Sequence, residues 1–388
     1  MREPARVFLN GRFLTQGTTG VQRHAREVVR ELDRLLSRIP TSADQPWMLL
    51  TPRGASMDFP LTNIQRRTVG RLTGHLWEQL ELPRHAAAGI LLGFANSGPI
   101  RHPRQVVTIH DAAVFAVPEA FSPRFGRWYR FLLPRLARRA RLVLTVSEFS
   151  ASELVQRAGV ARTKLRVVPP GSEHLHLIEA DRSILDRFSL IGQPFVLAVG
   201  SQSPHKNLAR LMEAVGPLSD RGYRIVVAGG VNPRIFGGMT MGPDAFTAVG
   251  YVTDGELRAL YEAASCLVFP SLYEGFGHPP LEAMSLGCPV VASSAASIRE
   301  VCGDAAVYCD PHQPEDIRRA ILEVINAPER GAELRRRGAA RAAMFSWKRT
   351  ARQIFEMVEE LIVDTSATIH SSIAAGPQSF FSPEANID

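Results

Sequence analysis

The chain has 388 residues, of which 45% are hydrophobic and 21% are charged, and this composition excludes a disordered, collagen-like or disulfide-dense protein. The formal charge of +7 is unevenly distributed, because residues 1–190 carry 28 Arg and Lys against 16 Asp and Glu, whereas the remainder carries 17 against 22. The length favours two domains, and the basic first half favours an anionic partner.

Membrane-spanning and secreted proteins are disfavoured by the distribution of apolar residues. No stretch reaches the roughly 18 uninterrupted apolar residues of a spanning helix, and residues 1–20 lack the apolar core of a signal peptide. We expect a cytoplasmic protein, soluble or peripheral at the inner face of the plasma membrane. The cysteines lie among apolar residues without metal-pair spacing, so we expect buried reduced thiols at Cys266, Cys288, Cys302 and Cys309.

In the first half, apolar strand-like runs alternate with helical stretches, a rhythm typical of a parallel sheet covered by helices. A glycine-rich turn ending at Gly20 leads from the first strand into a helix over residues 21–38. Ser150 and Glu153 have capping-box spacing for a later helix. The expected strands are residues 6–10, 105–110, 142–146 and 165–170.

The segment 122–141 carries seven arginines interleaved with aromatic residues and leucines. A basic, aromatic helix of this kind can lie on an anionic membrane surface through residues Arg124 to Arg141. It can equally be a domain helix with one core face and one solvated arginine face. The sequence leaves both interpretations open.

The second half repeats the alternating pattern after a polar segment without periodicity. Its expected strands are residues 195–200, 224–229, 247–249, 266–270, 289–293 and 307–309. Its expected helices are residues 207–219, 254–263, 277–286, 314–326 and 347–363. The pattern predicts an α/β fold of two doubly wound domains in tandem, with ligands bound in the cleft at the carboxyl ends of the strands.

The domain boundaries follow from these elements. We expect a first domain over residues 1–171, a linker over 172–193 and a second domain over 194–345. A helix over 346–364 would pack back toward the first domain. Residues 365–388 are rich in Ser, Ala and Pro, and we expect a disordered tail there.

The segment 273–284 carries the strongest functional signal, the string Tyr-Glu-Gly-Phe-Gly-His-Pro-Pro-Leu-Glu-Ala-Met. An apolar strand leads into a glycine-rich turn, and a helix opens near Gly277, where backbone amides and the helix dipole favour an anion such as a diphosphate. Glu274 and Glu282 flank this turn, and carboxylates accept hydrogen bonds from sugar hydroxyls. The alternative without a function is an ordinary helix start, with Glu274 at the cap and Glu282 on a solvated face.

This string resembles the signature of the retaining glycosyltransferases of family 4, which have the GT-B architecture of two facing Rossmann-like domains. The resemblance extends from about residue 7 to residue 347. It implies that Glu282 binds the nucleotide ribose and Glu274 contacts the donor sugar. It also implies that Gly275 belongs to the donor-binding turn and that the amides of Phe276 and Gly277 lie near the phosphates.

Other segments extend the resemblance. The loop 200–207 is similar to the family's Gly-x-x-x-Pro-Arg-Lys-Asn loop, in which Lys206 would neutralise a leaving diphosphate. Ser201 and His205 stand where many members carry arginines, so stabilisation of the diphosphate would rest on Lys206 with partial help from His205. Gly20 would approach the donor phosphate, whereas the bland interpretation of that residue is a plain glycine turn. His110, followed by Asp, matches a position that contacts the sugar or the acceptor.

Base recognition in this fold comes from the segment 249–252, which contains Gly250 and Tyr251. The segment 19–23, Thr-Gly-Val-Gln-Arg, is similar to members from bacterial polysaccharide assembly, which favours GDP-mannose as donor. We expect a glycan or lipid-linked saccharide as acceptor.

No nucleophile paired with a base is evident, so catalysis would rest on positioning and on stabilising the leaving diphosphate, with His110, Lys206 and Glu274 as catalytic residues. There is no Asp-x-Asp motif, so we expect no metal, no other cofactor and no nucleic-acid partner. The alternatives are a sugar-nucleotide epimerase on the same fold and a catalytically weak scaffold subunit.

Overall fold

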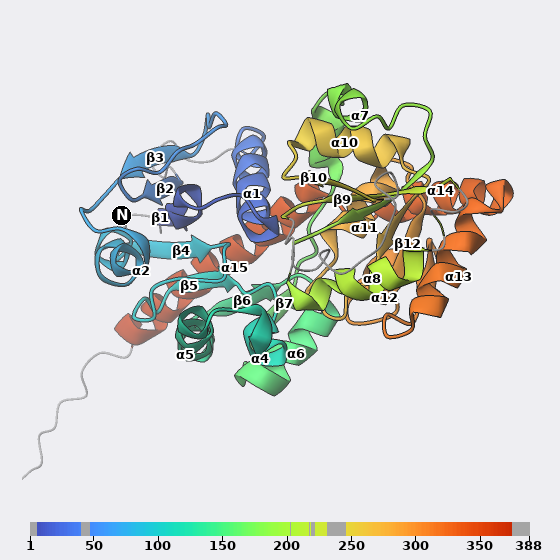
Figure 1. The fold of residues 1–388 in the computed structure, drawn as a ribbon. Coiled ribbons are helices and arrows are strands. Elements are labelled where there is room, and N and C mark those ends of the chain that lie inside the picture. Colours follow the sequence, from blue (N-terminus) through green and yellow to red (C-terminus); the bar gives the residue numbers. More distant parts are fainter. Residues whose placement is uncertain are drawn as a thin grey trace, which may run out of the picture.

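The computed structural model describes residues 6–39, 47–201, 203–216, 218, 222–230 and 246–374. These residues form two α/β units, each built on a parallel sheet, and the final helix returns from the second unit to the first (Figure 1). The predicted fold class is therefore confirmed. No helix in the described ranges is long and apolar enough to cross a membrane.

The first sheet contains seven parallel strands within the described residues, in the order β3-β2-β1-β4-β5-β6-β7. Its inner strands are short apolar runs buried on both faces, as expected of a sheet covered by helices on each side. The strands are β1 (Arg6–Asn10), β2 (Met48–Thr51), β3 (Gln65–Thr68), β4 (Gly89–Gly93), β5 (Gln105–Thr108), β6 (Leu142–Thr145) and β7 (Leu165–Val167).

Alternate residues of the first sheet enter different cores, because successive side chains of a strand point to opposite faces. Val7 and Leu9 pack with helices α1 (Gly20–Leu36) and α15 (Trp347–Ala374). Phe8 packs on the other face, against Trp77. That face is covered by η2 (Trp77–Glu81), α3 (Leu82–His85), α4 (Ala113–Ala116), α5 (Pro123–Arg139) and α6 (Glu148–Ala158). The short segments α2 (Gly74–Leu76) and η3 (Pro118–Ala120) bury no residue and precede η2 and α5 in the chain.

The second sheet has the order β10-β9-β8-β11-β12-β13, with all strands parallel. The order reverses between β8 and β11, and this is the switch point at which doubly wound sheets bind ligands. The strands are β8 (Phe195–Val199), β9 (Arg224–Ala228), β10 (Phe246–Gly250), β11 (Cys266–Phe269), β12 (Val290–Ser293) and β13 (Ala306–Cys309). The helices are α8 (Leu208–Val215), α10 (Asp254–Ala263), α11 (His278–Ser285), α12 (Ile298–Cys302), α13 (Pro314–Ile325) and α14 (Pro328–Ala342).

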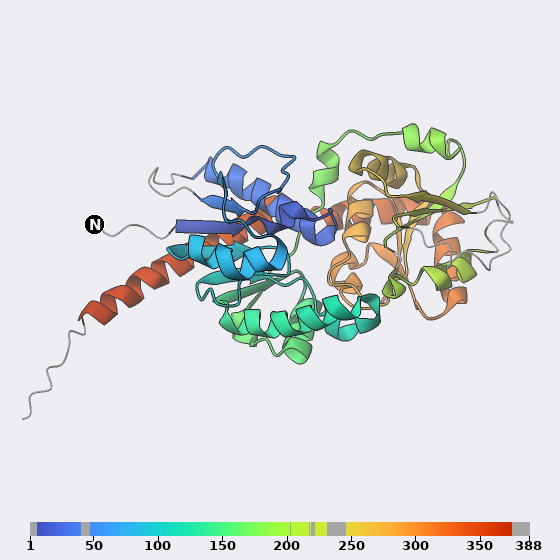
Figure 2. The same cartoon turned by 60° about the vertical axis from the view of Figure 1, so that its left-hand side comes forward.

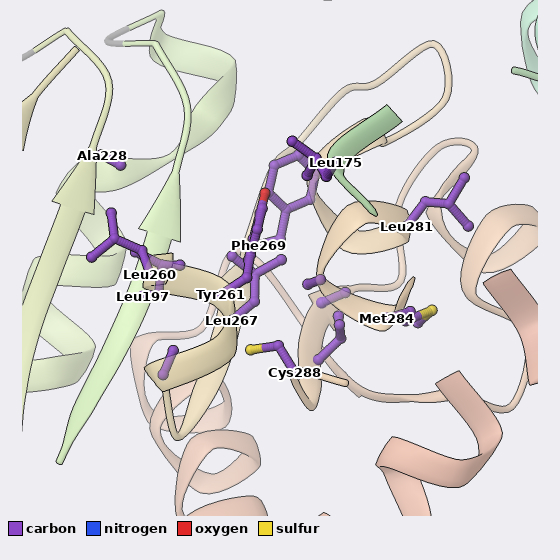
Figure 3. Packing of buried hydrophobic residues seen from close by; sticks show 14 of the residues in the cluster. Leu175, Leu197, Ala228, Leu260, Tyr261, Leu267, Phe269, Leu281, Met284 and Cys288 are labelled. Atoms are coloured by element: carbon purple, nitrogen blue, oxygen red, sulfur yellow. The ribbon is translucent and has the colours of Figure 1, made fainter. Parts of the chain in front are cut away.

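One core of the second unit lies between the sheet and helices α10 and α11. Tyr261 of α10 lies beside Leu267 and Phe269 of β11 in this core, and Met284 of α11 belongs to the same cluster on the far side of its helix (Figure 3). All four cysteines are buried and free. Burial raises the pKa of Cys288 to about 12, so this thiol stays protonated.

The segment 172–193, predicted as a linker, contributes to the core of the second unit. It contains η5 (Glu173–Leu177) and α7 (Ser183–Arg187). Leu175, Ile184 and Leu190 are buried within the core of the second unit. The segment lacks a periodic pattern because only single side chains anchor it to the core, each in or beside a short helical turn. It is therefore not a solvated linker.

Two helix boundaries differ from those predicted. The cap of α6 is Ser147, whose hydroxyl accepts from the amide of Ser150 over 3.0 Å, so the helix begins three residues before the predicted capping box. Helix α15 continues to Ala374, past the predicted end at residue 364, because Gly and Pro first occur at 376 and 377. The remainder of the predicted tail, 375–388, lies outside the described residues.

The two units lie side by side with the carboxyl ends of their inner strands directed toward the junction (Figures 1 and 2). In both views α15 runs from the junction along the first unit. Its side chains Trp347, Ile354 and Val358 belong to the first unit's core, where they pack against α1.

Candidate functional site

The turn after β11 touches the end of β5 across the junction, and glycine at position 275 allows this contact. A Cβ on Gly275 would lie 2.9 Å from Cβ of Asp111 and 3.1 Å from the carbonyl oxygen of His110. The carbonyl of Gly275 accepts hydrogen bonds from the hydroxyls of Ser147 and Ser150, over 2.6 and 2.8 Å. The first unit thereby fixes the glycine-rich turn of the second.

Lys206 and Glu274 form an ion pair beside this contact. Nζ of Lys206 lies 2.6 Å from Oε1 of Glu274, and both side chains are largely buried. The Lys206 ammonium also lies 5.5 Å from the ring centroid of Phe269. Burial raises the pKa of nearby Asp111, and the charge of Glu274 adds to that effect. A cation and two carboxyl groups therefore meet where the two units touch.

Asn207 holds the lysine loop in place, a role that the sequence did not reveal. Its backbone is left-handed, with φ of 61°, a conformation that Asn tolerates better than most residues. Its side-chain amide donates to the carbonyls of Pro270 and Pro311, over 3.1 and 2.6 Å. The backbone of His205 accepts from the amide of Leu272 over 2.7 Å. These bonds tie the loop after β8 to the end of β11.

Ser201 and His205 stand where the loop pattern described above has arginines, and neither residue is charged near pH 7. Ser201 is exposed, and its hydroxyl lies 3.2 Å from that of Ser203. Burial lowers the pKa of His205, and the neighbouring charge of Lys206 lowers it further, so the imidazole is neutral near pH 7. The positive charge of the loop therefore rests on Lys206.

The start of α11 offers fewer amides than a typical helix. Gly277 caps it with φ of 105°, and Pro279 and Pro280 in its first turn have no N–H groups. The hydroxyl of Ser297 donates to the carbonyls of Glu274 and Phe276, over 3.0 and 2.9 Å, and orients the turn. An anion at this helix start would therefore be held by the few amides around Gly277.

Glu282 is buried and has its own set of partners. The hydroxyl of Tyr261 donates to Oε2 over 3.1 Å, and Nε2 of His174 lies 3.5 Å from Oε1. Burial alone would raise the pKa of Glu282, but His174, His278 and Arg23 outweigh burial and lower the pKa to about 2. The carboxylate is therefore ionised throughout the physiological range.

Aromatic rings from both units meet near Glu282. His24 of α1 contacts His110 edge-on at 4.6 Å and Trp347 at 5.5 Å, and Trp347 stacks on His278 at 6.1 Å. Gly20 belongs to the same junction, because a Cβ there would lie 3.7 Å from the His278 ring. Nε2 of His110 donates to the carbonyl of Phe94 over 3.0 Å.

Burial keeps these imidazoles neutral. It lowers the pKa of His110 and of His278 to about 4, and it lowers the pKa of His24 well below the ordinary value. Neither ring nitrogen of His24 has a hydrogen-bond partner. Since the Phe94 carbonyl can only accept, Nε2 of His110 carries the proton and Nδ1 remains an acceptor.

The structure brings most of the predicted site residues to the junction. The two residues predicted for base recognition lie at the end of β10. Tyr251 is 89% exposed there, and Gly250 before it has a left-handed backbone with φ of 72°. No group of three or more His, Cys, Asp or Glu in the described ranges could hold a metal ion. Sequence reasoning missed Arg23, Tyr261 and His174, whose contacts with the site join residues far apart in the chain.

Residues 182–341 match the family model described as Glycosyl transferases group 1, and residues 75–173 match that described as Glycosyltransferase Family 4. The chain is 34% identical over 271 residues to O-antigen chain mannosyltransferase B of Escherichia coli, covering 66% of this chain and 70% of that protein. It is 29% identical to the serotype-specific mannosyltransferase WbdA of Escherichia coli, over 68% of this chain but only 34% of that longer protein. Among solved structures, sucrose-phosphate synthase of Thermosynechococcus elongatus matches with a TM-score of 0.69 at 19% identity, over 93% of this chain and 100% of that chain.

Proposed function

The chain belongs to the family 4 glycosyltransferases with the GT-B fold, and from this membership we propose that it transfers mannose from GDP-mannose to a glycan or lipid-linked saccharide, with retention of anomeric configuration and without a metal ion. The two Escherichia coli proteins named above are mannosyltransferases, and the name of one of them specifies an O-antigen chain. A role in bacterial polysaccharide assembly follows from the same similarity.

The ion pair between Lys206 and Glu274 is the observation that carries this proposal. It lies at the carboxyl ends of β8 and β11, where doubly wound sheets bind ligands, and directly beside the first unit. A donor diphosphate would take Lys206 as its counter-ion, and this exchange would free Glu274 to accept hydrogen bonds from sugar hydroxyls. One pair of residues could thus serve both the leaving group and the transferred group.

In the proposed reaction, the bond from the sugar anomeric carbon to the diphosphate oxygen breaks while the acceptor hydroxyl bonds to the same face of that carbon. The acceptor proton passes to the departing phosphate oxygen. Lys206 and the amides of Phe276 and Gly277 would stabilise the charge that develops on the diphosphate. Glu282 would hold the ribose, exchanging the Tyr261 or His174 contact for hydroxyls.

Neutral His110 fits a position on the acceptor side. Nδ1 of His110 can accept a hydrogen bond from a hydroxyl, because Nε2 is committed to the Phe94 carbonyl. With a pKa of about 4, His110 stays uncharged at neutral pH. It would orient a hydroxyl without adding a second cation near Lys206.

The experiment that tests this function begins with a thermal-shift panel of GDP-, UDP-, dTDP- and ADP-sugars. A hundredfold excess over Kd should stabilise the protein by about 2.7 kcal/mol, for the GDP-sugar alone. The matching donor is then incubated with a saccharide acceptor in EDTA, and the anomeric configuration of the product is read by NMR. An inverted product, a requirement for added metal or an epimerised donor without transfer would each contradict the proposal.

A further inference from the structure

An apolar patch rimmed by arginines lies on the outer face of the first unit. Leu76 is 64% exposed, Leu80 49% and Phe131 44%. The ring of Trp128 lies 5.9 Å from that of Phe131 and 5.1 Å from that of His75, the residue before Leu76. We refer to this patch and its rim as the arginine-leucine face. Its rim consists of exposed arginines on the same side of α5, namely Arg124, Arg127, Arg135 and Arg138.

Two elements build this face and are fixed to each other. Helix α5 buries Tyr129, Leu132 and Leu136 on one face, because residues three or four positions apart share a face of a helix. Phe131 and Arg135, also four apart, lie together on the exposed face, where the Arg135 guanidinium is 3.8 Å from the centroid of the Phe131 ring. The ring of His75, at the start of the neighbouring helical segment, lies 5.1 Å from that of Trp128. The two helical segments therefore run side by side over the sheet (Figure 2).

The charge that α5 brings to the face has a single sign. The segment 122–141 contains seven arginines and no carboxylate. On the neighbouring segment, the carboxylate of Glu78 is buried and paired with Arg12. Glu81 accepts from the backbone amides of Arg71 and Leu72, over 2.9 Å each. Arg12 therefore compensates the charge of Glu78, whereas Glu81 keeps its negative charge and is outnumbered by the four arginines of the rim.

We propose that the arginine-leucine face docks on an anionic lipid leaflet. Leu76, Leu80 and Phe131 would enter the interface, and the arginines of α5 beside them would meet lipid phosphates. Nucleic acid would pair with the arginines but leave the exposed leucines in water. A folded protein partner would need a uniformly acidic rim around an apolar centre to match this face. A bilayer of anionic lipids supplies both features over any area.

The face also leads to the site. Helix α5 is 17 residues long, about 25 Å at 1.5 Å per residue. Just before its first residue, η3 contacts η6 (Pro204–Lys206) of the second unit, and Glu119 lies close enough to act on His205. A saccharide anchored in the same leaflet would thus reach the junction beside the start of α5. The docking itself does not depend on the proposed function.

The first test compares apolar variants in vesicle co-sedimentation. Full-length protein is mixed with phosphatidylcholine vesicles, either pure or with about a third phosphatidylglycerol. The triple variant L76S/L80S/F131S removes the apolar centre. The control L177S/I191S removes two apolar side chains of the second unit that are 69% and 63% exposed. All variants are first shown to melt like the parent protein.

A second test separates charge from apolar contact. A quadruple Arg-to-Gln variant changes the rim at positions Arg124, Arg127, Arg135 and Arg138. Its control changes exposed arginines elsewhere, at positions Arg53, Arg335, Arg336 and Arg352. Both variants lose the same net charge, so a difference between them reports the position of the charges and not their number.

We expect the parent and both controls to bind phosphatidylglycerol vesicles, with binding that weakens as salt rises, and both face variants to lose at least about tenfold in partitioning. Equal binding to pure phosphatidylcholine, no vesicle binding, or equal loss in face and control variants would overturn the proposal. So would a dimer in solution that L76S/L80S/F131S dissociates, since the face would then join two copies of the chain. Vesicle binding without transferase activity would leave the docking intact and refute the proposed function instead.

Discussion

Arg23 of α1 and Asp254 of α10 join the two units through a two-pronged ion pair. Nη1 of Arg23 donates to Oδ2 of Asp254 over 2.8 Å, and Nη2 donates to the other carboxylate oxygen. The charge of Arg23 also acts on buried Glu282. The pair therefore fixes the position of the first unit's α1 over the proposed ribose carboxylate.

This pair should contribute measurably to stability, because both side chains are less than one-third exposed and the geometry is bidentate. A double-mutant cycle with Arg23→Ala and Asp254→Ala should give a coupling energy of about 1 kcal/mol in urea unfolding. The coupling should shrink in high salt. Strictly additive single effects at low salt would show that the pair does not link the units.

Removing the lysine charge should affect turnover more than binding. Lys206→Ala should reduce kcat by about 10²- to 10³-fold, the typical cost of one lost group that stabilises a developing anion. Lys206→Arg should retain part of the activity, and Lys348→Ala, at an exposed lysine, should retain all of it. The measurement is the initial rate at saturating donor. An unchanged kcat in Lys206→Ala would show that Lys206 does not stabilise the leaving diphosphate.

Replacing Glu274, the carboxylate that pairs with Lys206, should reduce sugar transfer more than nucleotide binding. Glu274→Gln keeps the shape of the side chain but loses the charge that pairs with Lys206. Calorimetry should find the affinity for the nucleoside diphosphate within a few-fold of the parent, while transfer falls by about 10²-fold. Equal loss of affinity and of transfer would place Glu274 on the nucleotide and not on the sugar.

The close approach at Gly275 predicts a steric effect on catalysis. Gly275→Ala puts a Cβ 2.9 Å from that of Asp111, so the turn must move away from the first unit. Since displacements of about 1 Å can cost 10²-fold, kcat/KM should fall by at least tenfold. Gly216→Ala, where a Cβ meets open space, is the matched control. Unchanged kcat/KM in Gly275→Ala would show that the contact has no catalytic consequence.

The neutral imidazoles predict acid sensitivity. The pKa of His110 and of His278 is about 4 in the folded protein, below the ordinary value of 6.5, so the unfolded chain binds protons first as pH falls. Stability should be fully present above pH 6.5 and decline by a few kcal/mol between pH 6.5 and 4. Urea midpoints should fall less steeply over this window in His278→Phe, whereas His312→Gln, at an exposed position, should follow the parent.

The sequence predicted the second unit closely because its elements have distinct patterns. Residues 254–263 were predicted as a helix and form α10 with the same bounds, and Thr253 and Glu256 form its capping box. Strand β3 was missed because Gln65–Thr68 is exposed along its whole length and carries no apolar alternation. Helix α14 was missed because its surface is mostly polar, with Leu334 as a lone deeply buried leucine.

For the site, the sequence predicted the residues on single motifs but not their partners. Glu274 and Lys206 belong to recognisable strings, and their 2.6 Å contact follows from the adjacency of β8 and β11. His174 and Arg23 act on Glu282 from segments that are 108 and 259 positions away in the chain. No local pattern encodes such contacts, because tertiary packing alone brings the segments together.

The course of α15 has a consequence for synthesis of the protein. This last described helix supplies Trp347, Ile354 and Val358 to the core of the first unit, where they cover Val28 and Leu32 of α1. The ribosome therefore releases the complete second unit before the first unit can close its apolar interior. During translation α1 keeps an uncovered apolar side while more than 300 further residues are made, and exposed apolar surface of this kind favours aggregation until α15 covers it.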